Sequence, residues 1–260
     1  MKMNFYIPTL GRFEKQITYN NLPKIIQKKT RFVIQPKEQD LFEEKYKKEK
    51  IIVLPKNDIG IAKTRQFITD LICDNKEVGF MFDDDLTFTY RKDHKHVSII
   101  MDDKKFLEVF NLIDLIFRDN KEVAHVGLER AGVFPRKGLY AIAKVFFTVH
   151  IINGKRWDKN IRWDEAIDTL EDIDICFQEI LCGKNPVRIN PYNYKQKGRN
   201  TDGGCSTYRT EQFQIKKEKE LLDKYKDFIT KKIDEAGNER ICKIMSLKAK
   251  KFYDTNQKFK

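Results

Sequence analysis

Short apolar runs alternate with longer stretches of helical periodicity, and this alternation constrains the fold more than any other feature of the chain. Strands are predicted at residues 3–7, 31–34, 51–54 and 78–82, and helices at residues 18–28 and 61–74. Strands that alternate with helices form β-α units, in which neighbouring strands run parallel. The sequence therefore predicts an α/β fold with a mainly parallel sheet.

The middle of the chain continues with both element types. His94 and His96 fall in a charged turn between two predicted strands; a metal-binding pair is the alternative, but without a third ligand they are predicted to be ordinary solvated residues. Asn153-Gly154 is a hairpin turn signal. The predicted elements are strands at residues 86–90, 97–100, 123–128 and 143–151, and helices that begin at Asp102 or Asp103 and at residues 169–172.

Three adjacent carboxylates, Asp83-Asp84-Asp85, follow the predicted strand at residues 78–82. Like charges at one point repel and raise each other's pKa, so the cluster is costly unless a metal ion or a buried arginine neutralises it. Oxygen ligands select hard cations such as Mg²⁺ or Mn²⁺, which keep open positions for substrate phosphates. A solvated acidic turn that closes the strand is the alternative interpretation.

Arg65 lies within an apolar helical stripe instead of on the solvent face of the predicted helix 61–74. The stripe contains Ile61, Ile68 and Ile72 at helical spacing. A buried guanidinium needs an anion, so we expect Arg65 to pair with Asp83 or with a ligand phosphate. An arginine that extends past Ile61 to solvent is the alternative.

Composition limits the class of protein. The 260 residues are 40% hydrophobic, which suffices for one α/β domain or for a domain with a smaller appendage. The five cysteines form no C-x-x-C pair, so neither a disulfide framework nor a zinc site is predicted. No apolar stretch is long enough for a membrane span, and no classical signal begins the sequence. A reducing, cytoplasmic location is expected.

A net charge of +12 predicts attraction to a polyanion such as nucleic acid, with an anionic membrane surface as the competing partner. The segment 184–199 combines basic and aromatic residues without an acid. Basic groups can hold a phosphate backbone and aromatic rings can stack on bases, although a basic surface loop is the alternative. The candidate DNA-binding residues are Lys184, Arg188, Tyr192, Tyr194, Lys195, Lys197 and Arg199.

A C-terminal helix is predicted from an apolar face opposite several lysines. The face extends from Leu221 to Ile233 and also includes Tyr225 and Ile229. The apolar side is expected to pack on the rest of the chain. The basic side is expected to contact DNA or an anionic membrane leaflet.

Four motifs resemble those of the GT-A-fold glycosyltransferases over residues 4–205. The resemblance implies a Rossmann-like, mixed and mainly parallel sheet flanked by helices, with a nucleotide-sugar donor across its C-terminal edge. We therefore predict a catalytic domain at residues 1–205 and a basic helical extension at residues 206–260. The motifs are Ile7-Pro8-Thr9-Leu10-Gly11-Arg12, Gly60-Ile61-Ala62-Lys63-Thr64-Arg65-Gln66, Phe82-Asp83-Asp84-Asp85 and Glu171-Asp172-Ile173-Asp174.

The same resemblance implies roles for individual residues. Asp85 and Asp83 would hold Mn²⁺ or Mg²⁺, with Asp83 near the ribose or the uracil. Asp172 would be the general base, with Glu171 second, although acids at a helix start also only complement its dipole. Many GT-A enzymes add a late histidine as a metal ligand, but no histidine follows His150 here, so Asp202 or a water is expected to substitute. The implied donor-binding residues are Pro8, Thr9, Arg12, Lys63, Arg65, Asp83 and Asp84.

Among these enzymes, the chain most resembles the TET-associated glycosyltransferases of bacteriophages, which glucosylate hydroxymethyluracil in DNA. The Ile-Pro entry, the Gly-Ile-Ala-x-x-Arg helix and the aspartate triplet come in the same order. The resemblance implies a UDP-sugar donor and a hydroxymethylated pyrimidine in DNA as the acceptor. Two alternatives stay open: a glycosyltransferase acting on a cell-surface polysaccharide or lipid, and a non-catalytic nucleic-acid-binding protein.

Overall fold

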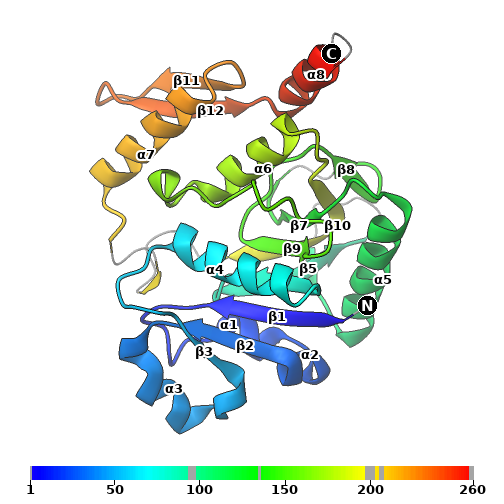
Figure 1. Cartoon of the computed structure of the whole chain (residues 1–260), viewed down its shortest axis with the longest axis vertical. Coiled ribbons are helices and arrows are strands. Elements are labelled where there is room, and N and C mark those ends of the chain that lie inside the picture. The colour runs from blue at the N-terminus through cyan, green and yellow to red at the C-terminus, as the bar shows by residue number, and fades with distance from the viewer. Residues whose placement is uncertain (1, 93–97, 134–135, 197–202, 205–207, 258–260) are drawn as a thin grey trace.

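The computed structural model describes residues 2–92, 98–133, 136–196, 203–204 and 208–257 of the chain. Within these ranges, ten strands form one sheet in the order β3-β2-β1-β4-β9-β7-β10-β5-β6, with β8 paired to β10. Two further strands form a separate small sheet near the C-terminus. Helices flank the large sheet (Figure 1).

The first half of the sheet is entirely parallel. It contains β1 (Met3–Pro8), β2 (Thr30–Ile34), β3 (Ile51–Val53) and β4 (Val78–Phe82). β1 pairs in parallel with both β2 and β4, and β2 pairs in parallel with β3. The carboxyl ends of these strands therefore meet at one edge, where the loops after β1 and β4 come together.

The second half mixes strand directions. Antiparallel β9 joins β4 to β7, and β7 pairs in parallel with β10. As a result β1 to β4, β6, β7 and β10 run one way, and β5, β8 and β9 run the other. The prediction of a mixed, mainly parallel α/β sheet is confirmed. The strands of this half are β5 (Leu86–Arg91), β6 (Ser98–Ile100), β7 (His125–Arg130), β8 (Tyr140–Ile142), β9 (Val149–Asn153) and β10 (Val187–Gln196).

Each face of the sheet has its own core, because alternate strand residues point to opposite faces. Phe5 and Ile7 of β1 belong to the core under α5 (Asp103–Asp119), whose predicted N-cap Asp102 accepts a hydrogen bond from Lys105 N at 2.8 Å. Tyr6 belongs to the opposite core, under α4 (Ile61–Asp74) and α6 (Glu171–Leu181).

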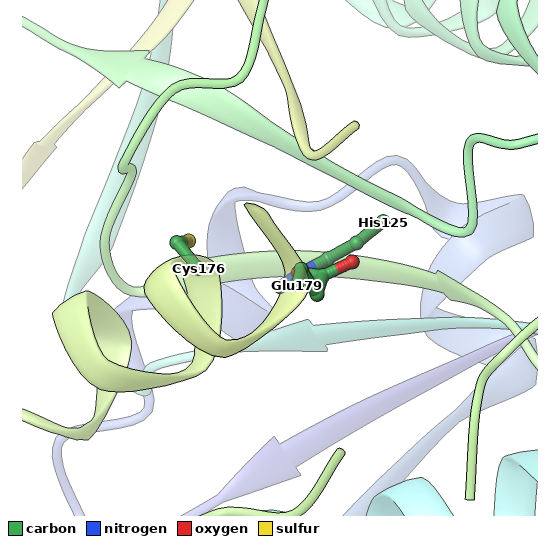
Figure 2. Close-up of side chains that lie close together, drawn as sticks. All are labelled: His125, Cys176 and Glu179. Carbon is green, nitrogen blue, oxygen red and sulfur yellow. The ribbon is translucent and has the colours of Figure 1, made fainter. Parts of the chain in front are cut away.

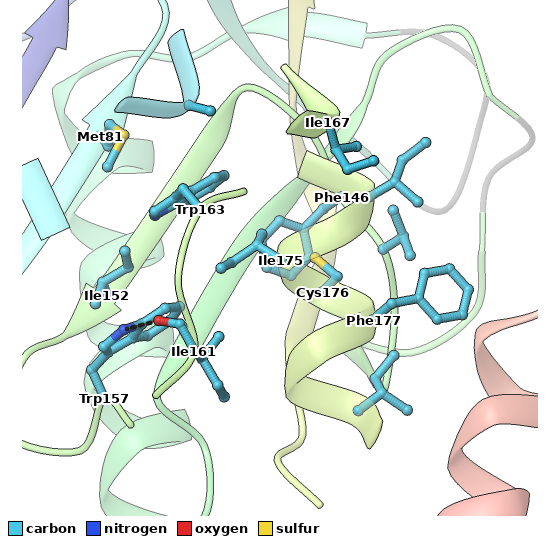
Figure 3. Packing of buried hydrophobic residues seen from close by; sticks show 14 of the residues in the cluster. Met81, Phe146, Ile152, Trp157, Ile161, Trp163, Ile167, Ile175, Cys176 and Phe177 are labelled. Atoms are coloured by element: carbon cyan, nitrogen blue, oxygen red, sulfur yellow. Dashed lines mark hydrogen bonds between the residues drawn. The ribbon is translucent and has the colours of Figure 1, made fainter. Parts of the chain in front are cut away.

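Large aromatic side chains fill the second core beneath α6 (Figure 3). Trp157 and Trp163 are both buried, and the indole Nε1 of Trp157 donates to the backbone oxygen of Ile161 at 3.2 Å. Buried indoles need such partners because an unpaired N–H is costly in an apolar setting. Cys176 of α6 is also buried here, as a free thiol; the other described cysteines, Cys73, Cys182 and Cys242, are free as well.

The single helix predicted at residues 18–28 is wrong. The chain instead forms α1 (Ile17–Asn21) and α2 (Lys24–Lys29), separated at Pro23. Proline disfavours a helical conformation in the preceding residue, and Leu22 is accordingly extended. The other short helices are η1 (Pro36–Glu38), α3 (Gln39–Lys45), η2 (Lys48–Lys50) and η3 (Glu165–Ile167).

The strand predicted at residues 143–151 begins later, at Val149, and ends at Asn153. Ala143 and Thr148 have positive φ angles of 53° and 59°, so the segment between them does not form a regular strand. The predicted hairpin at Asn153-Gly154 is also wrong. A Cβ at Gly154 would lie 2.3 Å from the backbone oxygen of Ile72, so glycine is needed for close packing against α4.

The C-terminal extension is only partly helical, contrary to the prediction. α7 (Glu211–Lys224) leads into a hairpin of β11 (Ile229–Ile233) and β12 (Glu239–Ile244), and α8 (Ser246–Gln257) follows. Apolar residues spaced by four fit a helix and also alternate on a strand, so the pattern at residues 225–233 was ambiguous. The predicted strand pair around residues 91–96 is confirmed as β5 and β6, and His94 and His96 lie outside the described residues.

Candidate active site

A cavity of about 660 Å³ opens at the carboxyl edge of the parallel strands. Its walls come from the residues after β1 and β4, the first turns of α4 and α6, and the β11–β12 hairpin. Crevices at this edge are the usual ligand sites of open α/β sheets. The predicted residues that line it are Pro8, Thr9, Arg12, Arg65, Asp83, Asp84, Asp85, Glu171, Asp172 and Tyr194.

The three carboxylates after β4 form what we call the carboxylate lip, Asp83 to Asp85. Asp84 is buried and anchors the loop after β1, because it accepts a hydrogen bond from Thr9 Oγ1 at 2.6 Å and one from Arg12 Nη1 at 2.5 Å. Burial raises the pKa of Asp84, although Arg12 and Thr9 oppose this shift. The negative charge of Asp84 is therefore compensated by Arg12 within the protein.

Asp85 faces the cavity beside Arg12. One of its oxygens lies 3.2 Å from Arg12 Nη1, and the other accepts a hydrogen bond from Gln196 Nε2 at 3.1 Å. Gln196 ends β10, so Asp85 links the two halves of the sheet. Arg12 also donates to the backbone oxygen of Gly203 at 3.3 Å.

Asp83 is the most exposed member of the lip, with 23% of its side chain accessible. Its Oδ1 accepts from Arg65 Nη2 at 3.0 Å. Burial, together with the neighbouring carboxylates, raises the pKa of Asp83 to about 7, even though Arg65 opposes the shift. Arg12 contacts both Asp84 and Asp85, and Asp83 shares Arg65 with Asp172 and Glu171, so in these contacts the three carboxylates of the lip outnumber the two guanidinium groups.

Arg65 is buried, as its place in an apolar stripe predicted, and its pairing with Asp83 is confirmed. Its guanidinium also pairs with Asp172 and lies 3.4 Å from Glu171 Oε1. The Trp163 ring lies 5.3 Å below it, a cation–π contact. One guanidinium thus joins the lip to the acidic start of α6.

Glu171 and Asp172 open α6, where the helix dipole favours negative charge. Burial alone would raise the pKa of Asp172, but Arg65 and His150 outweigh it and hold that pKa below its ordinary value. Burial and the charge of Asp172 raise the pKa of Glu171 well above its ordinary value. The two shifts have opposite directions, so Asp172 is the acid that ionises first and Glu171 the one that retains a proton longer.

Two buried histidines extend this network, and neither was predicted as a site residue. His150 Nε2 lies 2.8 Å from Asp172 Oδ1, and His150 Nδ1 lies 3.0 Å from His125 Nε2. His125 Nδ1 in turn lies 2.6 Å from Glu179 Oε2. The available signal was a histidine within each of two apolar strands, β7 and β9.

Lys63, an implied donor-binding residue, does not reach the cavity. It is exposed on the side of α4 away from Arg65, because side chains two positions apart on a helix point to different sides. Its Nζ lies 2.5 Å from Glu165 Oε2. The structure gives it a surface ion pair in place of a donor contact.

The predicted DNA-binding segment is mostly not a surface loop. Its centre is β10, a sheet strand that buries Arg188 and Tyr194. Arg188 Nη2 lies 3.2 Å from Glu129 of β7, so its charge is compensated inside the protein. Tyr192 donates to Glu108 at 2.8 Å, and Tyr194 contributes to the cavity wall.

The remaining candidate DNA-binding residues of segment 184–199 are partly described by the structure and partly outside the described residues. Lys184 is half-buried and Lys195 is exposed, so Lys195 remains accessible to a polyanion. Lys197 and Arg199 lie outside the described residues, as does the predicted metal ligand Asp202.

The C-terminal extension contributes to the cavity, which the sequence did not predict. Lys232, Arg240 and Ile241 of the hairpin line it, together with Gln214 and Glu218 of α7. Arg240 and Glu218 form a two-pronged ion pair with distances of 3.0 Å, which ties the hairpin to α7. Among the described residues, no helix combines the length and apolar character that a membrane crossing requires.

Two solved structures with low sequence identity are similar to the chain. One is a crystal structure of S. aureus TarS 1–349, with 15% identity, a TM-score of 0.46, and coverage of 75% of this chain and 60% of that one. The other is the same protein in complex with UDP, with 17% identity, a TM-score of 0.48, and coverage of 86% and 66%. The chain thus spans less than two thirds of their length, and likeness of this extent carries no conclusion about activity.

Sequence comparison is more decisive. No match is found among curated proteins. The family model described as "TAGT: TET-Associated Glycosyltransferase" matches residues 3–204, which include the lip, Arg65 and the start of α6. The family resemblance carried by the four motifs is confirmed, and this chain belongs to the TET-associated glycosyltransferase family.

Proposed function

We propose that the protein transfers a sugar from a UDP-sugar, with the help of Mn²⁺ or Mg²⁺, to a hydroxymethylated pyrimidine base in DNA. The observation that carries the proposal is the arrangement of the cavity in a chain of a glycosyltransferase family. The carboxylate lip forms one wall, and the ionised Asp172 lies across Arg65 from it. Sugar transfer needs one group that binds the donor and, opposite it, one that activates the acceptor hydroxyl; the lip and Asp172 are placed for these two tasks.

The lip has the chemistry that a hard divalent cation requires. Asp83 and Asp85 offer carboxylate oxygens to the same cavity, where the three carboxylates of the lip share Arg12 and Arg65. We assign Asp85 and Asp83 as the ligands, and Asp202 as a further candidate. A bound ion would act as a Lewis acid on the diphosphate oxygens of the donor.

The nucleotide part of the donor is proposed to lie along the ends of β1 and β2. Pro8 and Thr9 line the cavity there, beside the apolar side chains of Val33, Leu54 and Ile59. An apolar slot next to a polar, charged edge suits a base attached to a ribose diphosphate. Arg12, held by the lip, lies at the diphosphate end.

Asp172 is proposed as the general base, in preference to Glu171. Burial and the charge of Asp172 raise the pKa of Glu171, so of the two acids Glu171 is the one that retains a proton more readily. Asp172 remains ionised. A positioned carboxylate accelerates such a step by roughly 10² to 10⁴.

Basic residues at the cavity suit a nucleic-acid acceptor. Arg130, Arg209 and Lys232 line the cavity; Arg130 and Lys232 are exposed and Arg209 is half-buried. The exposed Lys195 lies between the cavity residues Tyr194 and Gln196 at the end of β10. Such side chains position a phosphate backbone, and the target base of a duplex would have to leave the stack to reach the sugar. The net charge of +12 agrees with a polyanionic partner.

Sugar transfer assays test the proposal. The protein is incubated with UDP-glucose and other UDP-sugars, Mn²⁺, and either DNA containing 5-hydroxymethyluracil or 5-hydroxymethylcytosine or the same DNA without modification. We expect UDP release and a mass increase only with the modified DNA, and a rate roughly 10² to 10⁴ lower in Asp172→Asn. Transfer to a polysaccharide or lipid, with none to any DNA, would refute the acceptor assignment.

A further inference from the structure

A row of four buried side chains leads from the cavity into the interior: Asp172, His150, His125 and Glu179, called here the proton chain. The three contacts between them measure 2.8, 3.0 and 2.6 Å. Figure 2 shows His125 on its strand and Glu179 on its helix directed toward one another. Only Asp172 lies at the cavity, and both histidines are 0% exposed.

A metal site at the inner end would be a different interpretation. Among the described residues, His125, Cys176 and Glu179 have ligand atoms within 4.8 Å of one another. However, both ring nitrogens of His125 already have hydrogen-bonding neighbours, Glu179 and His150. A metal ligand needs a nitrogen lone pair that is not engaged in this way, so the geometry favours proton transfer.

Two proton arrangements fit these contacts; in the first, no proton lies between Asp172 and His150, and Arg65 Nη1 contacts both of them instead. In the first, Arg65 donates to His150 Nε2, His150 Nδ1–H donates to His125 Nε2, and His125 Nδ1–H donates to an ionised Glu179. In the second, Glu179 is protonated and donates to His125 Nδ1, and each histidine carries its proton on Nε2. His150 Nε2–H then donates to Asp172.

We propose that these two arrangements interconvert during catalysis, so that Glu179 stores the proton that Asp172 takes from the acceptor hydroxyl. This inference rests on the proposed function. The hydroxyl proton passes to Asp172 and on to His150 Nε2, while the Nδ1 proton of His150 passes to His125 and that of His125 to Glu179. Asp172 is ionised again, Glu179 is neutral, and after product release the protons return along the same path to water.

The surroundings of Glu179 are suited to a residue that accepts a proton during the reaction and returns it later. Glu179 is 1% exposed and faces His125 and Cys176, and its Oε1 has no hydrogen-bond partner among the described residues. This oxygen is a buried acceptor position that no donor among the described residues fills. Asp172 itself is a weak base, because Arg65 and His150 lower its pKa, and gains from passing its proton on.

Packing keeps both imidazole rings in place. The His125 ring lies against Phe146 and Trp157, with centroid distances of 4.6 and 5.5 Å, and His150 lies 4.9 Å from Trp163. His150 faces Arg65 and Asp172 on its outer side. Burial and Arg65 lower the pKa of His150 to about 3, so the ring passes a proton on without remaining charged.

Nitrogen NMR of the histidine rings tests the chain without any substrate. The protein has four histidines, and His150→Asn assigns one of the two buried rings. As the pH falls, we expect His125 and His150 to exchange the Nδ1–H tautomer for the Nε2–H tautomer together. In Glu179→Gln the joint exchange is lost, because the amide cannot take the proton. Separate titration of the two rings, or identical behaviour of Glu179→Gln and wild type, would overturn the proposal.

Single-turnover transfer in mixtures of H₂O and D₂O tests its use in catalysis. In the wild type we expect a curved dependence of the rate on deuterium fraction, because several protons move in one relay. Glu179→Gln is expected to give a linear dependence and a rate lower by roughly tenfold to hundredfold, with KM unchanged. A linear dependence in the wild type, or an unchanged curve in Glu179→Gln, would contradict the relay.

Asp174→Asn is the matched control, since Asp174 is an equally buried carboxylate of α6 that lies outside the proton chain; it accepts a hydrogen bond from the Tyr225 hydroxyl and pairs with Lys224, both at 2.7 Å. We expect its rate to stay within about twofold of the wild type, with the curve retained. A linear dependence of the rate on deuterium fraction in Asp174→Asn would count against the relay. If no UDP-sugar is used by the wild type, the proposed function fails, whereas the tautomer result decides the chain independently.

Discussion

Two groups of carboxylates face each other across Arg65, and they differ in how their charge is balanced. At the start of α6, Arg65 and His150 lower the pKa of Asp172, while burial and Asp172 raise the pKa of Glu171. At the carboxylate lip, Arg12 contacts both Asp84 and Asp85, while Asp83 shares Arg65 with the acids of α6. The first group is balanced from within the protein, and the second lacks positive charge.

This difference agrees with the roles proposed for the two groups. A balanced, buried pair is suited to receive and pass on a proton, because its partners already fix its charge and orientation. An excess of negative charge at an open cavity is suited to a cation that arrives with the substrate. Substitutions that remove one partner at a time can break or sharpen this comparison.

The largest effect is expected for Asp85→Ala. Loss of a ligand to the divalent ion would remove several kcal/mol of charge stabilisation and lower the transfer rate by about 10³-fold or more. The fold should survive, because Arg12 still pairs with Asp84. UDP release measured over a range of Mn²⁺ concentrations checks this. Asp114→Ala, at an exposed acid of α5, is the control, and turnover retained in Asp85→Ala would contradict a metal role.

Next comes Arg65→Met, which affects both groups at once. It leaves Asp83, Glu171 and Asp172 without their shared guanidinium, and removal of one partner from a buried ion pair costs about 3 to 5 kcal/mol of unfolding free energy. Urea denaturation measures the loss. Arg162→Met removes an exposed ion pair with Asp70 and should cost below about 1 kcal/mol. Equal losses in the two variants would show that Arg65 is not a central partner.

A smaller, pH-dependent effect is expected at His150. Its pKa is about 3 in the folded protein against an ordinary 6.5, so between these values the unfolded chain binds a proton that the folded protein does not. Stability therefore falls as the pH falls below 6.5. Between pH 7 and pH 5, His150→Asn should lose about 2 kcal/mol less than the wild type in urea unfolding. Parallel losses in the two proteins would refute the buried, neutral histidine.

The smallest effect is expected for Lys63→Ala. Its exposed pair with Glu165 contributes little, so stability should change by below about 1 kcal/mol and the transfer rate by about twofold at most. Steady-state kinetics with varied UDP-sugar checks the rate and KM together. A large rise in KM would restore the donor-binding role that the family resemblance implied.

Local patterns allowed part of the fold and site to be predicted. The first and last residues of α4 and β4 agree with the prediction. Helical spacing and a short apolar run are both patterns of neighbouring residues, so they can be recognised without knowledge of distant contacts. The pairing of Arg65 with Asp83 was also predictable, since a buried arginine preceded an acidic strand end. Membership of the glycosyltransferase family followed from motifs in a fixed order.

Contacts distant in sequence were not predictable in this way. His125 and His150 meet only because β7 and β9 pair, and Glu179 reaches them from α6. Arg188 resembled a surface phosphate ligand because its buried partner, Glu129, lies on another strand. The hairpin at residues 229–244 was hidden by apolar spacing that also fits a helix.

The central claim is that the carboxylate lip binds a divalent cation together with the donor diphosphate. A crystal structure of the protein with Mn²⁺ and UDP-glucose tests it most directly, with manganese located from its anomalous signal. We predict one manganese ion bound by Asp85 and Asp83 and by diphosphate oxygens, with the uridine near Pro8 and Thr9. A bound nucleotide with no metal at the lip, or manganese bound only elsewhere, would contradict the account.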